Sequence, residues 1–96
     1  MTGFQKKYLR GLAHSLKPVV QVGQSGLNDA VTEQVEAQLL AHELIKVKMR
    51  EPENKKAMAE ALAASSGAVL CGLVGHTAIL YRPHPEEPTI VLPERA

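Results

Sequence analysis

Hydrophobic residues follow two different periods along this chain, and the change of period separates helices from strands. A period of about four residues predicts an amphipathic helix from about Asn28 to His42, with an apolar stripe of Leu27, Val31, Val35 and Leu39. A period of two, strict from Ile45, predicts a half-buried strand over Leu44–Met49. The short apolar run Pro18–Val22 predicts a further, buried strand.

Capping and helix-breaking residues place two more helices. Thr2 opens a capping box of the form T-x-x-Q, so a first helix is expected from there to about Leu16, and Pro18 ends it. Asn54 starts a third, alanine-rich helix that Gly67 stops. The mostly small face of this helix, suited to lying close to a sheet, consists of Ala57, Met58, Ala61, Leu62 and Ser65.

The last third of the chain predicts a hairpin. Strands are expected over Val69–Val74 and Thr77–Arg82, and Gly75 suits the first central position of the tight turn between them. The segment Thr89–Leu92 could add an edge strand, although the many prolines around it argue against one.

The order α-β-α-β-α-β-β predicts an α/β fold of the two-layer α+β kind, with about four strands in a mixed sheet packed by helices. Its two β-α-β units imply parallel neighbouring strands with right-handed crossovers. No internal repeat or long linker divides the chain. We expect one domain over residues 1–83, followed by a proline-rich tail over residues 84–96.

Charge is distributed unevenly, although the net charge of the 96 residues is only +1. Residues 1–50 carry seven Lys and Arg against four Asp and Glu, whereas residues 51–96 carry four against six. The single cysteine, Cys71, excludes an internal disulfide and should be an inert residue of an apolar strand. Because no signal-peptide pattern and no apolar run of roughly 20 residues occurs, we expect a cytoplasmic protein with no membrane partner.

The first predicted helix separates apolar from basic residues. On a helical wheel of about 100° per residue, one side carries Phe4, Tyr8, Leu9, Leu12 and Leu16. The other side carries Lys6, Lys7, Arg10 and His14, and no acidic residue occurs before Asp29. A solvated helix face normally mixes both signs, so this face is either a short ordinary surface or a contact surface for phosphates.

A second candidate site is the loop Gly23-Gln24-Ser25-Gly26, which lies between a predicted strand and a predicted helix. A G-x-x-G loop can bring bare backbone N–H groups close to a phosphate, with a helix N-terminus behind them. RNA-binding KH modules clamp a nucleotide backbone with such a loop. The alternative is a glycine turn that binds nothing.

The strand lysines are a third candidate. Lys46 and Lys48 share one face of their strand, where they either solvate an open sheet or continue the basic surface, with Arg82 as a further member. Base stacking on a sheet needs aromatic residues on strands, and only Tyr81 meets that condition. We therefore expect little readout of bases.

No catalytic or metal site is indicated. The sequence contains no H-E-x-x-H, C-x-x-C or G-x-x-x-x-G-K-[ST] motif, and no metal-ligand spacing joins its scattered histidines, which are His14, His42, His76 and His84. We expect no enzyme activity, no cofactor and no small-molecule substrate.

Several runs of residues resemble a known family. Within Leu12–Leu27, His42–Lys48 and Val74–Arg82, the chain is similar to YhbY-type CRM domains (chloroplast RNA splicing and ribosome maturation). The resemblance covers nearly the whole chain up to about Pro83. It implies a stand-alone bacterial RNA-binding domain whose fold resembles the C-terminal domain of translation initiation factor three.

The resemblance also implies particular contacts. Its expected RNA contacts map to the loop residues Gly23, Gln24, Ser25 and Gly26 and to the basic residues Lys6, Lys7, Arg10, Lys46 and Lys48. Some relatives place a lysine in the loop, whereas Gln24 and Ser25 are uncharged. Any grip by this loop must therefore come from backbone N–H groups and flanking helices.

The resemblance implies an RNA-binding protein of ribosome assembly, because bacterial members of this family associate with precursors of the large ribosomal subunit. Its expected partner is the phosphate backbone of ribosomal RNA in precursors of the large (50S) subunit, with ribosomal proteins as further partners. The alternative is a protein-interaction module that docks on a ribosomal protein or assembly factor, through its sheet edge or its tail, without touching RNA.

Overall fold

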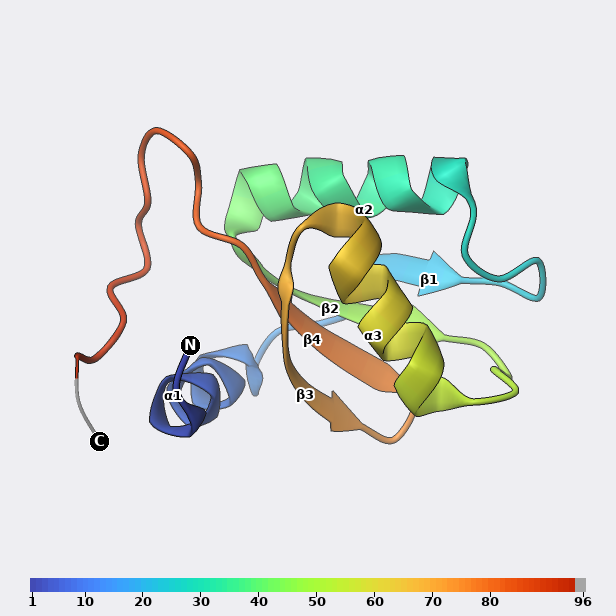
Figure 1. The fold of residues 1–96 in the computed structure, drawn as a ribbon, viewed down its shortest axis with the longest axis horizontal. Coiled ribbons are helices and arrows are strands. Elements are labelled where there is room, and N and C mark those ends of the chain that lie inside the picture. Colours follow the sequence, from blue (N-terminus) through green and yellow to red (C-terminus); the bar gives the residue numbers. More distant parts are fainter. Residues whose placement is uncertain (95–96) are drawn as a thin grey trace.

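Three helices and four strands follow the expected order in the computed structural model, which describes residues 1–94 (Figure 1). They are α1 (Gly3–Ala13), β1 (Val20–Val22), α2 (Asp29–His42), β2 (Leu44–Met49), α3 (Lys55–Ser66), β3 (Val69–Val74) and β4 (Thr77–Tyr81). The α/β class with a four-stranded mixed sheet is confirmed. The first helix is one turn shorter than predicted and the first strand begins two residues later.

Side-chain caps begin each helix where the sequence places them. The Thr2 side chain accepts a hydrogen bond from the Gln5 N–H, and Gln5 reciprocates, so the capping box is formed. Asn28 and Asn54 cap α2 and α3 in the same way. Gly67 ends α3 with a φ of 68°, a left-handed conformation that glycine adopts at low cost.

The sheet has the strand order β1-β2-β4-β3, which corrects one topological prediction. β1 and β2 are parallel neighbours, as expected. β2 and β3 are not neighbours, because β4 lies between them and is antiparallel to both. The tight turn at Gly75 forces β4 to lie beside β3, and the hairpin enters the sheet with β4 on the inside.

Alternate residues of β2 and β4 face two separate cores. α2 and α3 cover one face, where the buried residues of the sheet include Ile45, Val47 and Leu80. α1 covers part of the other face through Leu9 and Ala13 (Figure 1). Helices therefore lie on both faces of the sheet. α1 covers only part of its own face, and much of the rest of that face stays open.

The buried stripe of α3 differs from the predicted one. Its buried residues are Ala59, Leu62, Ala63 and Ser66, so Leu62 is the only residue that the two sets share. Met58 and Ala61 are half-buried and border the space beside the loop that follows β1. The small residues of α3 thus serve two surfaces, the sheet and this loop.

The C-terminal tail is held by one buried carboxylate, and the predicted edge strand at residues 89–92 is absent. Glu43 is 3% exposed and accepts hydrogen bonds from the backbone N–H groups of His84, Thr89 and Ile90 and from the Thr89 hydroxyl. Burial alone would raise the pKa of Glu43, but these hydrogen bonds hold it at about 2. Ile90 and Leu92 then pack on the core beneath α1.

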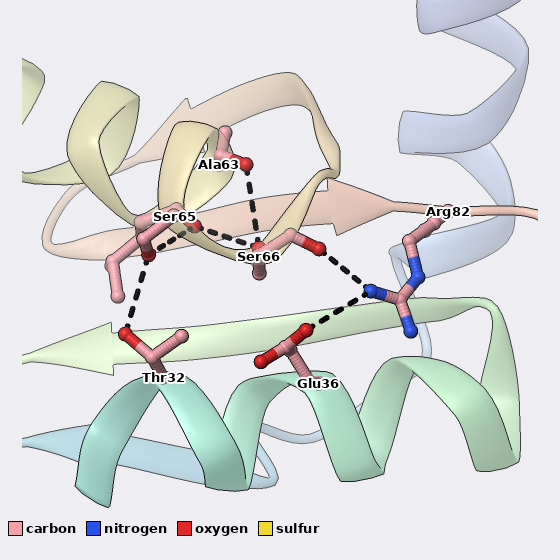
Figure 2. A network of polar contacts seen from close by, with 7 residues as sticks. Thr32, Glu36, Ala63, Ser65, Ser66 and Arg82 are labelled. Carbon is pink, nitrogen blue, oxygen red and sulfur yellow. Dashed lines mark hydrogen bonds and ion pairs between the residues drawn. The ribbon is translucent and has the colours of Figure 1, made fainter. Parts of the chain in front are cut away.

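Arg82 lies in a polar network on the α2/α3 face (Figure 2). Its Nη1 donates a hydrogen bond to the Ser66 carbonyl at 2.7 Å and lies 3.7 Å from a carboxylate oxygen of Glu36. Thr32 and Ser65 form a second link between α2 and α3 in the same view. Arg82 therefore joins the two helices and does not extend the basic surface as the sequence suggested.

Candidate nucleic-acid interface

The G-x-x-G loop is a closed turn in which the two glycines have different roles. The Gly26 N–H donates to the Gly23 carbonyl at 3.0 Å, and Gly26 has a φ of 73°, which disfavours any residue with a side chain. Gly23 has no such φ, and a Cβ added there would meet nothing within 4 Å. The fold thus requires glycine at position 26 but leaves Gly23 free for the close approach of a ligand.

The exposed turn adjoins a hollow of about 480 Å³ between two helix starts. Since β1 and β2 are parallel, the loop into α2 and the loop into α3 leave the same edge of the sheet. The Arg50 N–H joins these loops by donating to the Val22 carbonyl at 2.9 Å. Arg50 also lines the hollow, together with Glu51 and Glu53, so its rim carries both signs of charge.

Arg50 was missed by the sequence reasoning. It comes directly after the strand Leu44–Met49, so it belongs neither to the two-residue period of that strand nor to the four-residue period of a helix. The parallel pairing of β1 with β2 gives the signal that could have found it, because parallel strands end at one edge.

A second hollow, which we call the basic groove, has a volume of about 350 Å³ and lies on the open sheet face beside α1. It is lined by Arg10, His14, Pro18, Lys46, Val74, Thr77 and Ile79. The structure therefore brings together Arg10 and Lys46, which are 36 positions apart in the sequence.

Both cations of the basic groove are positioned by backbone carbonyls. Arg10 Nη1 donates to the Cys71 carbonyl at 2.8 Å, and the arginine stem lies against Gly72, where a Cβ would come within 2.5 Å of it. Lys46 Nζ donates to the carbonyls of His14 and Leu16, at the end of α1. Neither cation forms an ion pair with a carboxylate among residues 1–94, and both groups keep further N–H donors for a ligand.

The other predicted cations differ in position and exposure. Lys48 is exposed on the same strand face as Lys46 and pairs in register with Gln21, two positions before Gly23. Lys7 is exposed on the outer side of α1, whereas Lys6 is half-buried. Lys48 therefore connects the groove with the loop, and Lys6 contributes least to the open surface.

None of these five cations forms a salt bridge with a carboxylate within residues 1–94, where the single ion pair joins Arg82 to Glu36. Unpaired cations on one surface leave a positive potential that an anionic partner can use. The structure therefore brings Arg10 and Lys46 together in one groove, with Lys48 on the same strand face as Lys46.

Only one edge of the apolar side of α1 is buried. Leu9 and Ala13 are buried, but Phe4, Tyr8, Leu12 and Leu16 are each about 40% exposed. Tyr81, the one aromatic residue on a strand, is 4% exposed and lies in the core beneath α1, so it is not available to stack on a base. The exposed aromatic rings thus belong to the helix and not to the sheet.

Among residues 1–94, the Cys71 thiol is unreactive and the metal-ligating side chains are not clustered. Burial raises the pKa of the Cys71 thiol to about 11, so it stays protonated at neutral pH. No group of three metal-ligating side chains occurs among the described residues. No helix in the described part of the chain is long and apolar enough to span a membrane.

Comparisons with known proteins agree on one family. Residues 1–82 match the CRS1/YhbY (CRM) domain. The chain is 42% identical over 95 residues to the probable RNA-binding protein YqeI of Bacillus subtilis, covering 97% of this chain and 99% of that protein. It is also 42% identical over 93 residues to an RNA-binding protein of Haemophilus influenzae, covering 95% of this chain and 93% of that one.

A solved structure is similar over the same extent. The solution structure of the hypothetical protein SAV1595 of Staphylococcus aureus superposes with a TM-score of 0.84 at 37% identity, covering 97% of this chain and 99% of that one. This likeness extends through the C-terminal tail, beyond the residues matched by the domain family.

Proposed function

The chain belongs to the CRS1/YhbY (CRM) domain family, and from this premise we propose that it binds ribosomal RNA in precursors of the large subunit. The curated relatives that match it are named for RNA binding and not for catalysis. In this proposal the protein is a cytoplasmic ribosome-assembly factor that holds structured RNA mainly through its phosphates. No chemical step is assigned to it.

The observation that carries this proposal is the set of unpaired cations on the open sheet face. Arg10 and Lys46 line one groove, and Lys48 extends the same surface toward Gly23. Each cation that replaces a counterion at a phosphate adds favourable free energy when that counterion is released. The carbonyl contacts of Arg10 and Lys46 fix these cations in advance, which lowers the entropy cost of binding.

The G-x-x-G loop would add further contacts to the RNA without carrying a charge of its own. Gly23 leaves room for a phosphate at the turn, while Gln24 and Ser25 are exposed beside it. The N-terminus of α2 stands behind the loop, where helix N–H groups favour an anion. A net charge of only +1 predicts modest affinity for bare RNA, which suits a factor that also contacts ribosomal proteins.

The test compares wild type with Gly23→Asp on a fragment of large-subunit ribosomal RNA. Gly23→Asp should fold normally, since its position is open, and should weaken binding by about tenfold by repelling a phosphate. Gln34→Glu, on the exposed side of α2, adds the same charge as a control. Gly26→Asp is the poorer test, because the φ of 73° strains any side chain there. Equal binding by wild type and Gly23→Asp would remove the loop from the site.

Crosslinking in cells tests the ribosomal part of the proposal. Crosslinks from this protein to large-subunit ribosomal RNA in precursor particles are the expected result. Crosslinks to proteins alone would favour the protein-interaction module instead.

One structural feature favours the protein-interaction module, an apolar groove of about 440 Å³ bordered by Leu12, Leu16 and Val19. Ile90 of the tail also lines this groove, so the tail is already engaged with the fold.

A further inference from the structure

The outer face of α1 carries two aromatic rings one helical turn apart. Phe4 and Tyr8 are 41% and 42% exposed, so each residue leaves a substantial area open to solvent. Together with Lys7, Gly11 and Leu12 they line an open depression of about 380 Å³. This volume falls within the range of about 300–1,000 Å³ that small-ligand sites occupy.

Gly11 is a second, independent sign that something flat lies on this face. It stands in the last turn of α1, where alanine is still a better helix former than glycine. A Cβ added at Gly11 would meet nothing within 4 Å, and its φ lies outside the left-handed region. Neither packing nor backbone conformation therefore accounts for a glycine here, whereas the approach of a ligand would.

The charge around the depression indicates which class of ligand would bind there. Lys7 lies inside it, Arg10 follows one turn later on the neighbouring side, and no acidic residue precedes Asp29. Two exposed rings beside unpaired cations match a single-stranded nucleotide, whose base stacks on aromatic side chains while its phosphate meets a cation. A purely apolar protein partner would leave these cations unmatched.

We propose that Phe4 and Tyr8 form a stacking platform for an unpaired RNA base, with Gly11 leaving room for it and Lys7 contacting the adjoining phosphate. This inference rests on the proposed RNA binding and adds a preference for single-stranded segments. It also reverses the expectation of little base contact, because the rings that stack lie on a helix and not on the sheet.

Tyrosine fluorescence offers a direct test. The chain has no tryptophan and two tyrosines, of which Tyr81 is buried, so quenching by added RNA reports on Tyr8. An unstructured ten-nucleotide RNA should quench this fluorescence, and a blunt RNA duplex of equal length should quench it much less. Because the Tyr8→Leu variant lacks the reporting ring, its affinity is measured by filter binding, and the substitution should weaken binding of the single strand about 5- to 150-fold, the range expected for loss of one stacked base. Tyr8→Phe, which keeps the ring, should bind as wild type does.

Gly11→Ala separates binding from folding. It should raise the melting temperature by about 4–8 °C, because alanine is the better helix former, and should weaken binding of the single strand. Equal affinity of wild type and Tyr8→Leu for the single strand would overturn the platform while leaving RNA binding intact. If wild type binds neither RNA, the proposed function fails together with the platform. Loss of a protein contact in precursor particles by Tyr8→Leu, with RNA affinity unchanged, would assign this face to a protein.

Discussion

The two faces of the sheet use the same residue types for different purposes. On the α2/α3 face, Arg82 contacts Glu36 and the Ser66 carbonyl, and the apolar residues between helices and sheet are buried. On the α1 face, cations have no acidic partner among residues 1–94, and aromatic rings are exposed. On the α2/α3 face, the charges and apolar side chains therefore have partners within the fold. On the α1 face, the cations and aromatic rings stay available to a binding partner. Substitutions on the first face should change stability, and those on the second should change binding.

The largest expected effect is a loss of stability on the α2/α3 face. Leu62→Ala removes a fully buried side chain and should lower the free energy of unfolding by about 2–5 kcal/mol. Leu16→Ala, at a side chain that is 39% exposed near the end of α1, should cost less than about 1 kcal/mol. Urea denaturation measures both values. Similar losses in the two variants would show that the α1 face is as tightly packed as the other.

The next effect concerns the buried carboxylate that holds the tail. Glu43→Gln should cost roughly 2–3 kcal/mol at pH 7, because an amide replaces one acceptor oxygen of a group whose pKa is held at about 2. Since folding lowers this pKa from 4.5, the stabilisation is complete above pH 4.5 and is lost as the pH falls toward 2.

Urea denaturation across this pH range provides the check on Glu43. Wild type should lose stability between pH 4.5 and 2, and Glu43→Gln should lose less over the same interval. Glu86→Gln, at an exposed residue of the tail, is the matched control and should behave as wild type. The same acid loss in wild type and Glu43→Gln would assign that loss to other groups.

Local signals in the sequence predicted the elements well, because caps and breakers act over three or four residues. Thr2, Asn28, Asn54 and Gly67 each do what their position predicts. The strand order could not be predicted in the same way, since β4 contacts β2 through pairing between residues some thirty positions apart. Local patterns contain no information about which strand a hairpin places on the inside.

The candidate site was predicted only in part, for a related reason. Charge counts identified the basic residues and the G-x-x-G spacing identified the loop. The helical wheel grouped Phe4 and Tyr8 with Leu9 on the apolar side, but periodicity shows which residues share a face and not which part of that face meets the sheet. The burial of Glu43 was not predicted, because no local sequence pattern shows that the C-terminal tail will pack against this glutamate.

A smaller effect, on binding alone, is expected from the strand lysines. Lys48→Gln should weaken RNA binding by roughly five- to tenfold and reduce the slope of log affinity against log salt by about 1, because one phosphate contact is lost. Gln34→Glu changes the net charge equally from the α2 side and should change affinity much less. Filter binding at several salt concentrations measures both slopes. An unchanged slope in Lys48→Gln would remove this lysine from the interface.

The smallest expected effect tests whether RNA binding is confined to the α1 face of the sheet. Arg82→Met removes one charge-assisted hydrogen bond and a half-exposed ion pair, so it should cost only about 1 kcal/mol of stability. RNA affinity should stay within about twofold of wild type, because the guanidinium contacts Ser66 of α3 and Glu36 of α2 and does not line the basic groove. A loss of affinity as large as that of Lys48→Gln would mean that RNA reaches both faces. The partition of this molecule into a structural face and a binding face would then be wrong, since a cation already paired within the fold would also contribute to binding.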